Sequence, residues 1–181
     1  MRSIAWIGLL VIPLAAIAGD TAESWVRRQI PGVPFTAEMP EGGAVKSRGA
    51  AHYGPIKNGG EAWSEDLTLD DWPGGSWKNM IRLGYLRGWG EHDLILMPSR
   101  KTWGEPTHKK WQGWETIEYG YNDLKEDGQK TLQVHYIIEI QSKVYLELYL
   151  SCLEKDFPRY APYYSRIRDS LLPAQSRKTT D

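Results

Sequence analysis

Two consecutive runs of alternating apolar and polar residues, 131–140 and 144–153, constrain the fold of this chain more than any other feature. The apolar residues stand at every second position, and they are Leu132, Val134, Tyr136, Ile138 and Ile140 in the first run, then Val144, Leu146, Leu148, Leu150 and Cys152 in the second. Side chains two positions apart lie on the same face of a β-strand. The two runs therefore predict a long antiparallel hairpin with one buried face.

The segment after the hairpin changes to helical spacing. Tyr164, Ile167 and Leu171 are three and four residues apart, so they share one face of a helix. We expect this helix to begin near Pro162, because a proline fits the first turn, and to end at Pro173. The predicted core comes from the hairpin and the helix, namely Leu132, Val134, Ile138, Val144, Leu146, Leu148, Leu150, Ile167 and Leu171.

Earlier segments predict further strands and one more helix. Residues 50–69 form a candidate hairpin around the Asn58-Gly59 turn signal. Ser76 can cap a central helix over 77–88, where Trp77, Met80, Ile81 and Gly84 share a face. We expect 98–110 to be a polar loop and 111–121 to be one strand, with Gly113 marking a bulge.

These elements indicate an α+β fold: an antiparallel sheet of six or seven strands with a central and a C-terminal helix packed on it. No repeat or interdomain linker divides the chain. We expect a signal peptide at 1–18, a lead-in segment at 19–32, a single α+β domain at 33–172 and a disordered tail at 173–181.

The amino terminus has the pattern of a secretory signal. Arg2 precedes an apolar run from Ile4 to Ile17, and Ala16-Ile17-Ala18 predicts cleavage before Gly19. A membrane anchor is the alternative, but a spanning helix needs roughly 20 apolar residues. We therefore expect a secreted or periplasmic protein with no stable membrane span after signal cleavage.

Charge and motifs argue against several function classes. The formal net charge is -1, so no global positive field attracts nucleic acid. The four histidines, His52, His92, His108 and His135, show no metal-ligand spacing, and no nucleophile or phosphate-loop motif is present. The acids Glu65, Asp66, Asp70 and Asp71 match no calcium loop. We expect no catalytic residue, no metal and no cofactor.

Two single residues have ordinary structural interpretations. Cys152, the one cysteine, falls on the predicted core face and should be a small buried hydrophobe rather than a catalytic thiol. His135 lies on the opposite face, beside Tyr145 or Tyr149, where we expect a solvated sheet residue rather than a general base.

Tryptophan supplies the functional prediction. The chain has nine Trp and only two Phe. Trp72, Trp89 and Trp103 lie at predicted element ends, and exposed indoles stack on sugars, peptides or cations. We therefore expect a non-enzymatic binding or accessory protein of the cell envelope that recognises a protein partner or a glycan through these three residues.

Two other classes stay open. An exported hydrolase would use scattered Asp, Glu and His residues, and an assembly factor or inhibitor of a secreted toxin would expose an apolar patch. Geometry discriminates among binding modes, because a concave aromatic groove favours a small ligand and a flat patch favours a protein.

The order of elements resembles a known superfamily. The chain is expected to have VPFTAEMP near the start, a hairpin, a central helix, strands around WQGWETIEYGY, a long hairpin and a final PYYSRIRDSL helix. This order is similar to that of PsbP proteins of photosystem II, Mog Ran-binding proteins and bacterial DcrB-like proteins. Gly113 and the Ser170-Leu171 ending match features of that group. The resemblance implies an α/β/α-like sandwich around an antiparallel sheet, binding or assembly roles, and no shared catalytic residues.

Overall fold

The computed structural model describes residues 23–42, 46–53, 61–69, 79–88, 106–124 and 128–174. Most of these residues lie in antiparallel strands, and one α-helix is present among them. The elements are β1 (Ser24–Gln29), β2 (Phe35–Glu41), β3 (Lys46–Tyr53), β4 (Glu61–Thr68), β5 (Met80–Arg87), β6 (Thr107–Trp111), β7 (Trp114–Leu124), β8 (Lys130–Gln141), β9 (Val144–Leu153), the 3-10 turn η1 (Glu154–Asp156), α2 (Phe157–Asp169) and β10 (Leu172–Pro173).

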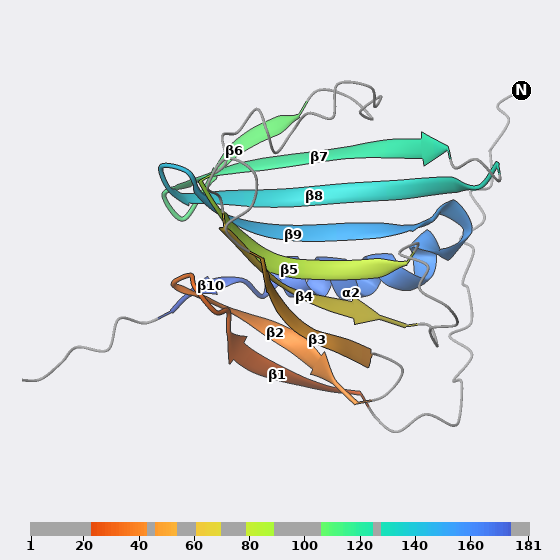
Figure 1. Ribbon diagram of the computed structural model, residues 1–181, viewed down its shortest axis with the longest axis horizontal. Coiled ribbons are helices and arrows are strands. Elements are labelled where there is room, and N and C mark those ends of the chain that lie inside the picture. Colours follow the sequence, from red (N-terminus) through yellow and green to blue (C-terminus); the bar gives the residue numbers. More distant parts are fainter. Residues whose placement is uncertain are drawn as a thin grey trace, which may run out of the picture.

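The strands form two sheets (Figure 1). The large sheet has seven strands in the order β3-β4-β5-β9-β8-β7-β6, and the small sheet has three in the order β1-β2-β10. All pairs are antiparallel. Every neighbouring pair of the large sheet is consecutive in sequence except β5 and β9, so this pair joins an early meander to a late one.

The predicted hairpin of alternating residues is confirmed as β8 and β9. Val134 lies opposite Leu150 and Leu132 opposite Cys152, so the apolar positions of both strands share one face. This face, called the core face below, packs on α2 and on the small sheet. All nine predicted core residues are buried or packed against the core there, with Leu148, Leu150 and Ile167 fully buried.

The C-terminal helix is also confirmed, but it begins and ends earlier than predicted, at Phe157 and Asp169. α2 starts at Phe157, so Pro158 occupies the first turn and Pro162 stands inside the helix. Tyr160, Tyr164 and Ile167 form its buried face against β9 and β5. No helix in the described ranges has the length and apolar character needed to cross a membrane.

The predicted central helix over 77–88 is wrong: β5 occupies the described part of it. Ile81, Leu83 and Tyr85 alternate onto the core face, which is the period of a strand. The strand pairing explains why a glycine occupies position 84, because a Cβ there would lie 2.1 Å from the backbone oxygen of Trp63 on β4. The glycine therefore permits a close approach between two strands, not between a helix and the sheet.

The predicted single strand over 111–121 is a hairpin of β6 and β7. Gln112 has a φ of 50° and Gly113 a φ of 93°, the left-handed dihedrals of a tight two-residue turn. Gly113 is thus a turn residue rather than a bulge, and the last part of the predicted loop 98–110 is strand β6. The other early hairpin, β3 with β4, is confirmed by its register.

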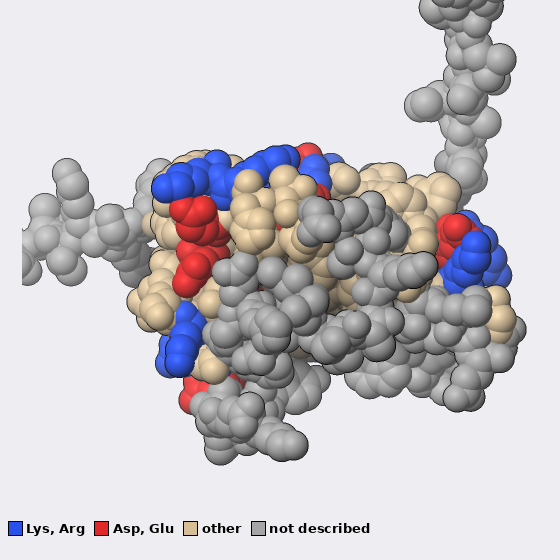
Figure 2. Space-filling view, turned by 90° about the horizontal axis from the view of Figure 1, so that it is seen from above, with Lys and Arg blue, Asp and Glu red and all other residues tan. Residues whose placement is uncertain are grey.

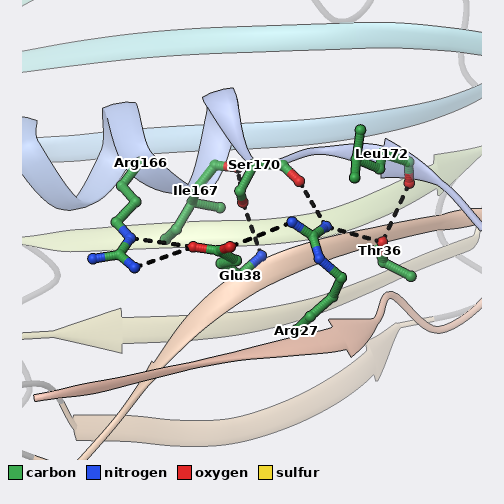
Figure 3. Close-up of polar contacts among 7 residues, drawn as sticks. All are labelled: Arg27, Thr36, Glu38, Arg166, Ile167, Ser170 and Leu172. Atoms are coloured by element: carbon green, nitrogen blue, oxygen red, sulfur yellow. Dashed lines mark hydrogen bonds and ion pairs between the residues drawn. The ribbon is translucent and has the colours of Figure 1, made fainter.

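The small sheet is fixed to α2 by polar contacts (Figure 3). Its strand β1 lies within the segment expected as a lead-in, 19–32. Arg166 Nη2 of α2 lies 3.2 Å from Glu38 Oε2 of β2. Arg27 of β1 donates to the Ser170 carbonyl oxygen at 2.8 Å. The N-terminal strands and the C-terminal helix consequently form one packed unit.

Candidate functional site

A groove opens where the core face of β6, β7 and β8 extends beyond α2. Its volume is about 450 Å³, within the size range of small-molecule sites. We call it the β6–α2 groove. It is lined by Lys109, Lys110, Trp111, Thr116, Glu118, Tyr136, Arg168 and Asp169.

The floor of the groove is polar and comes from β7 and β8. Glu118 lies opposite Tyr136 in the strand register, and Thr116 shares their face because it is two positions from Glu118. Thr116 Oγ1 donates to the backbone oxygen of Lys109 at 3.0 Å, which ties the floor to β6. Burial raises the pKa of Tyr136, an effect partly offset by a hydrogen bond with Thr116, so the phenol remains protonated at neutral pH.

The wall from α2 is an arginine that contacts two carboxylates. Arg168 Nη1 lies 3.1 Å from Glu118 Oε1, and its Nε lies 2.9 Å from Asp169 Oδ1. Burial lowers the pKa of Arg168, but the hydrogen bond and charge of Asp169 and the charge of Glu118 raise it by more. The guanidinium is therefore held in place, and the remaining carboxylate oxygens can accept hydrogen bonds from a ligand.

The wall from β6 carries Lys109 and Trp111. Lys109 is exposed, and its ammonium makes no ion pair with any described residue. Lys110, by contrast, lies 3.1 Å from Glu115. Figure 2 looks down on the β6 side of the molecule and shows basic side chains gathered along one margin beside acidic ones. This wall presents a cation that the described residues leave without a counter-charge.

Trp111 is half-buried at the end of this wall. Its ring lies 6.0 Å from the rings of Phe35 and Trp114, so the indole is held against the core. A fixed aromatic side chain can stack on a ligand at little entropic cost.

The tryptophans predicted as the binding surface, Trp72, Trp89 and Trp103, lie outside the described residues. The structure therefore does not test them. The described indoles Trp25, Trp63, Trp111 and Trp114 all pack against the core. The groove combines Trp111 with side chains that local sequence patterns do not bring together, because the polar residues 107–110 of β6 have the composition of a loop.

The face of the large sheet opposite the groove carries a second polar arrangement. Asp66, Arg82, Tyr149, His135 and Tyr119 lie opposite one another in register across β4, β5, β9, β8 and β7. We call these five residues the polar row. At one end Arg82 donates two hydrogen bonds to Asp66, at 2.7 and 2.9 Å.

His135 stands within this row and is oriented by its neighbours. Its Nδ1 lies 2.8 Å from Glu147 Oε1, and its ring stacks on Tyr119 at a centroid distance of 4.6 Å. Tyr149 lies on its other side at 4.4 Å. The expectation of a solvated His135 is wrong, because its side chain is only 12% exposed. The pairing with Tyr149, one of two predicted partners, is confirmed.

Burial keeps Tyr119 and Tyr149 of this face protonated, and hydrogen bonds orient Tyr121 and Tyr149. Tyr121 and Tyr149 both donate to Gln133 Oε1, the latter at 2.7 Å. Burial, with the nearby charge of Glu147, raises the pKa of Tyr119. Burial also raises the pKa of Tyr149, although a hydrogen bond to Ser151 opposes it. The hydroxyls of Tyr121 and Tyr149 are therefore donors that fix the side chain of Gln133.

The thiol of Cys152 has a structural role. Cys152 is fully buried on the core face, as predicted, and burial raises the pKa of its thiol to about 12. It is therefore not an activated nucleophile. Within the described ranges, no group of three or more His, Cys, Asp or Glu side chains is close enough to hold a metal ion.

Comparison with protein-family models finds no match for this chain, and comparison with curated proteins finds no similar sequence. The resemblance to PsbP, Mog and DcrB-like proteins thus stays a prediction. The groove and the polar row are therefore the features of this chain from which a function can be inferred.

Proposed function

We propose that this protein is a non-enzymatic binding protein that takes a saccharide in the β6–α2 groove. One observation carries the proposal: a concave site of about 450 Å³ combines two aromatic side chains, Trp111 and Tyr136, with positively and negatively charged side chains that can form hydrogen bonds. A concave aromatic site favours a small ligand, whereas a protein partner would favour a flat surface. The glycan is therefore the better supported of the two ligands expected from the sequence.

The lining matches the chemistry of a sugar. A sugar ring has an apolar face of C–H groups and a rim of hydroxyls that both donate and accept. Trp111 offers an aromatic surface for the face. Glu118 and Asp169 offer acceptors, and the protonated Tyr136 offers a hydroxyl that can donate or accept. The predicted signal peptide supports an envelope location, where such ligands are abundant.

The same geometry argues against glycoside hydrolysis in the groove. Hydrolysis of this kind needs one protonated carboxyl group and one carboxylate on opposite sides of the scissile bond. Glu118 and Asp169 instead both contact Arg168, at 3.1 and 2.9 Å. Both carboxylates therefore lie against the same guanidinium and not on opposite sides of a space for a scissile bond.

The proposal is tested by titrating the full chain with a panel of neutral and acidic oligosaccharides. We expect quenching of Trp fluorescence and a rise in Tm of several degrees at saturating ligand, since binding at about 100 times Kd adds about 2.7 kcal/mol of stability. Tyr136→Phe, which removes one hydroxyl, should weaken binding. Tyr163→Phe, on α2 outside the groove lining, is the matched control. Absence of binding by any saccharide would refute the proposal.

A hydrolase is the second candidate, and the His135–Glu147 pair is the observation that favours it. A carboxylate on Nδ1 orients an imidazole for proton transfer through Nε2. His135 Nε2 is buried, and it has no hydrogen-bond partner within the described part of the chain. Hydrolysis of a chromogenic ester or glycoside that His135→Gln abolishes would support this candidate; equal rates in the variant would exclude His135 as its base.

An assembly factor or toxin inhibitor remains a third prediction. Such a protein needs a contiguous exposed apolar patch of several hundred Å². The large exposed hydrophobic residues of the described ranges are Val26 and Leu172, on the outer strands of the small sheet. These two side chains do not make a patch of that size.

A further inference from the structure

We infer that the saccharide of the β6–α2 groove is acidic, and that Lys109 binds its carboxylate. This inference rests on the proposed function and names its ligand class. Its basis is the uneven distribution of charge between the two walls of the groove.

The α2 wall carries more negative than positive charge, because the one guanidinium of Arg168 faces two carboxylates. Arg168 contacts both Glu118 and Asp169. Placing a ligand carboxylate against these two acids would add a third negative charge to one guanidinium. The acidic group of a ligand is therefore excluded from the α2 wall, where neutral hydroxyls can donate to the carboxylate oxygens.

The β6 wall carries a positive charge instead. Lys109 makes no ion pair with any described residue, whereas its neighbour Lys110 contacts Glu115 at 3.1 Å. A ligand carboxylate would satisfy the ammonium of Lys109 with a charge-assisted hydrogen bond. The groove thus has a cation at one wall and acceptors at the other, which orients a sugar that carries one carboxylate.

The spacing of Lys109 and Trp111 fits one sugar unit. They are two positions apart on β6, hence on the same face and about 7 Å apart along the strand. A pyranose ring stacked on the indole places an exocyclic carboxylate toward the lysine. In a uronic acid the carboxylate is bonded directly to a ring carbon, so uronic acids match this arrangement.

The test compares the methyl glycoside of galacturonic acid, which carries one carboxylate, with its methyl ester, which differs by one methyl group and has no charge. Calorimetric titration of the full chain should show the acid binding at least about tenfold more tightly than the ester, because the ester loses a charge-assisted contact. Lys109→Met, which keeps the apolar stem, should remove this preference, and Lys109→Arg should largely retain it. Lys155→Met in η1 removes the same charge outside the groove lining and is the control.

The outcomes that would overturn the role of Lys109 are distinct from those that would overturn saccharide binding. Equal binding of acid and ester would overturn the inference and leave saccharide binding intact. A preference for the acid that Lys155→Met weakens as much as Lys109→Met would also overturn it, because the effect would then be one of net charge. If neither probe binds but a neutral sugar does, the inference fails alone; if no saccharide of the panel binds, the proposed function fails with it.

Discussion

His135 and Glu147 form a direct pair across β8 and β9, with Nδ1 of the imidazole 2.8 Å from Oε1 of the carboxylate. They are not opposite each other in the register; His135 lies opposite Tyr149, and Glu147 opposite Ile137. The contact is therefore diagonal, between side chains on the same face. Because a carboxylate can only accept, the imidazole donates through Nδ1.

Replacing Glu147 should show how much this pair contributes to stability. In Glu147→Ala the buried Nδ1–H loses its acceptor, and we expect a loss of about 1–3 kcal/mol in the free energy of unfolding. Glu147→Gln keeps an acceptor oxygen and should lose less. Urea denaturation measures both. Glu154→Ala, at an exposed position of η1, is the control; wild-type stability of Glu147→Ala would contradict the importance of the pair.

Gly84 should tolerate no side chain. A Cβ at this position would lie 2.1 Å from the backbone oxygen of Trp63, and β4 cannot retreat because it is paired on both sides. We expect Gly84→Ala to destabilise the fold by about 1–3 kcal/mol or more, as for other overpacked sites. The denaturation midpoint measures this loss.

The control for Gly84 is Gly42→Asn. Gly42 has a φ of 74°, but a Cβ there would meet no atom within 4 Å. Asn is one of the residues that adopt the left-handed region most readily. A comparable loss of stability in both variants would mean that steric contact with β4 is not the cause.

The sequence predicted the long hairpin because its alternation extends over many residues and fits no other structure. β5 was ambiguous. Met80, Ile81 and Gly84 satisfy helical spacing, while Ile81, Leu83 and Tyr85 satisfy strand spacing. Pairing with β4 on one edge and β9 on the other selects the strand over the helix. This pairing is long-range, so it cannot be predicted from the spacing of residues within the segment.

The candidate site was less accessible to prediction than the fold. The groove brings together β6, β7, β8 and the end of α2, and Lys109 and Arg168 are far apart in sequence. A usable signal was present at Gln112-Gly113, because a Gly in a two-residue turn between polar and apolar strands indicates a hairpin. That interpretation would have placed Lys109 and Trp111 on one face of an edge strand.

Alkaline pH should destabilise the protein through its buried tyrosines. Burial raises the pKa of Tyr119, Tyr149 and Tyr164, and it raises the pKa of Cys152 to about 12. Unfolded tyrosines ionise near pH 10, at about their ordinary pKa. Above that pH the unfolded state loses protons that the folded state keeps, so the free energy of unfolding falls as pH rises.

Absorbance of tyrosinate and circular dichroism, followed together between pH 9 and pH 13, measure this effect. We expect a fraction of the tyrosines to titrate only when the strand signal is lost. Ionisation of all tyrosines near pH 10 with the fold intact would contradict the burial of these three side chains. Below pH 9 their contribution to stability should be constant.

The side chain of Ser170 should replace the backbone acceptor that a continued β10 would offer to the edge of β2. Leu172 lies opposite Thr36 and Pro173 opposite Phe35, so the same register would place Ser170 opposite Glu38. There the chain has already turned into α2, and the Glu38 amide donates to Ser170 Oγ at 2.8 Å (Figure 3). The same hydroxyl donates to the Ile167 carbonyl at 2.8 Å.

Loss of this hydroxyl should loosen the small sheet. Ser170→Ala removes both hydrogen bonds, and we expect a loss of about 0.5–1.5 kcal/mol for each, with faster hydrogen exchange at the Glu38 amide. Ser170→Thr keeps the hydroxyl and should retain most of the protection. Ser165→Ala, also on α2, is the control. Unchanged exchange at Glu38 in Ser170→Ala would show that the side chain does not complete the edge of β2.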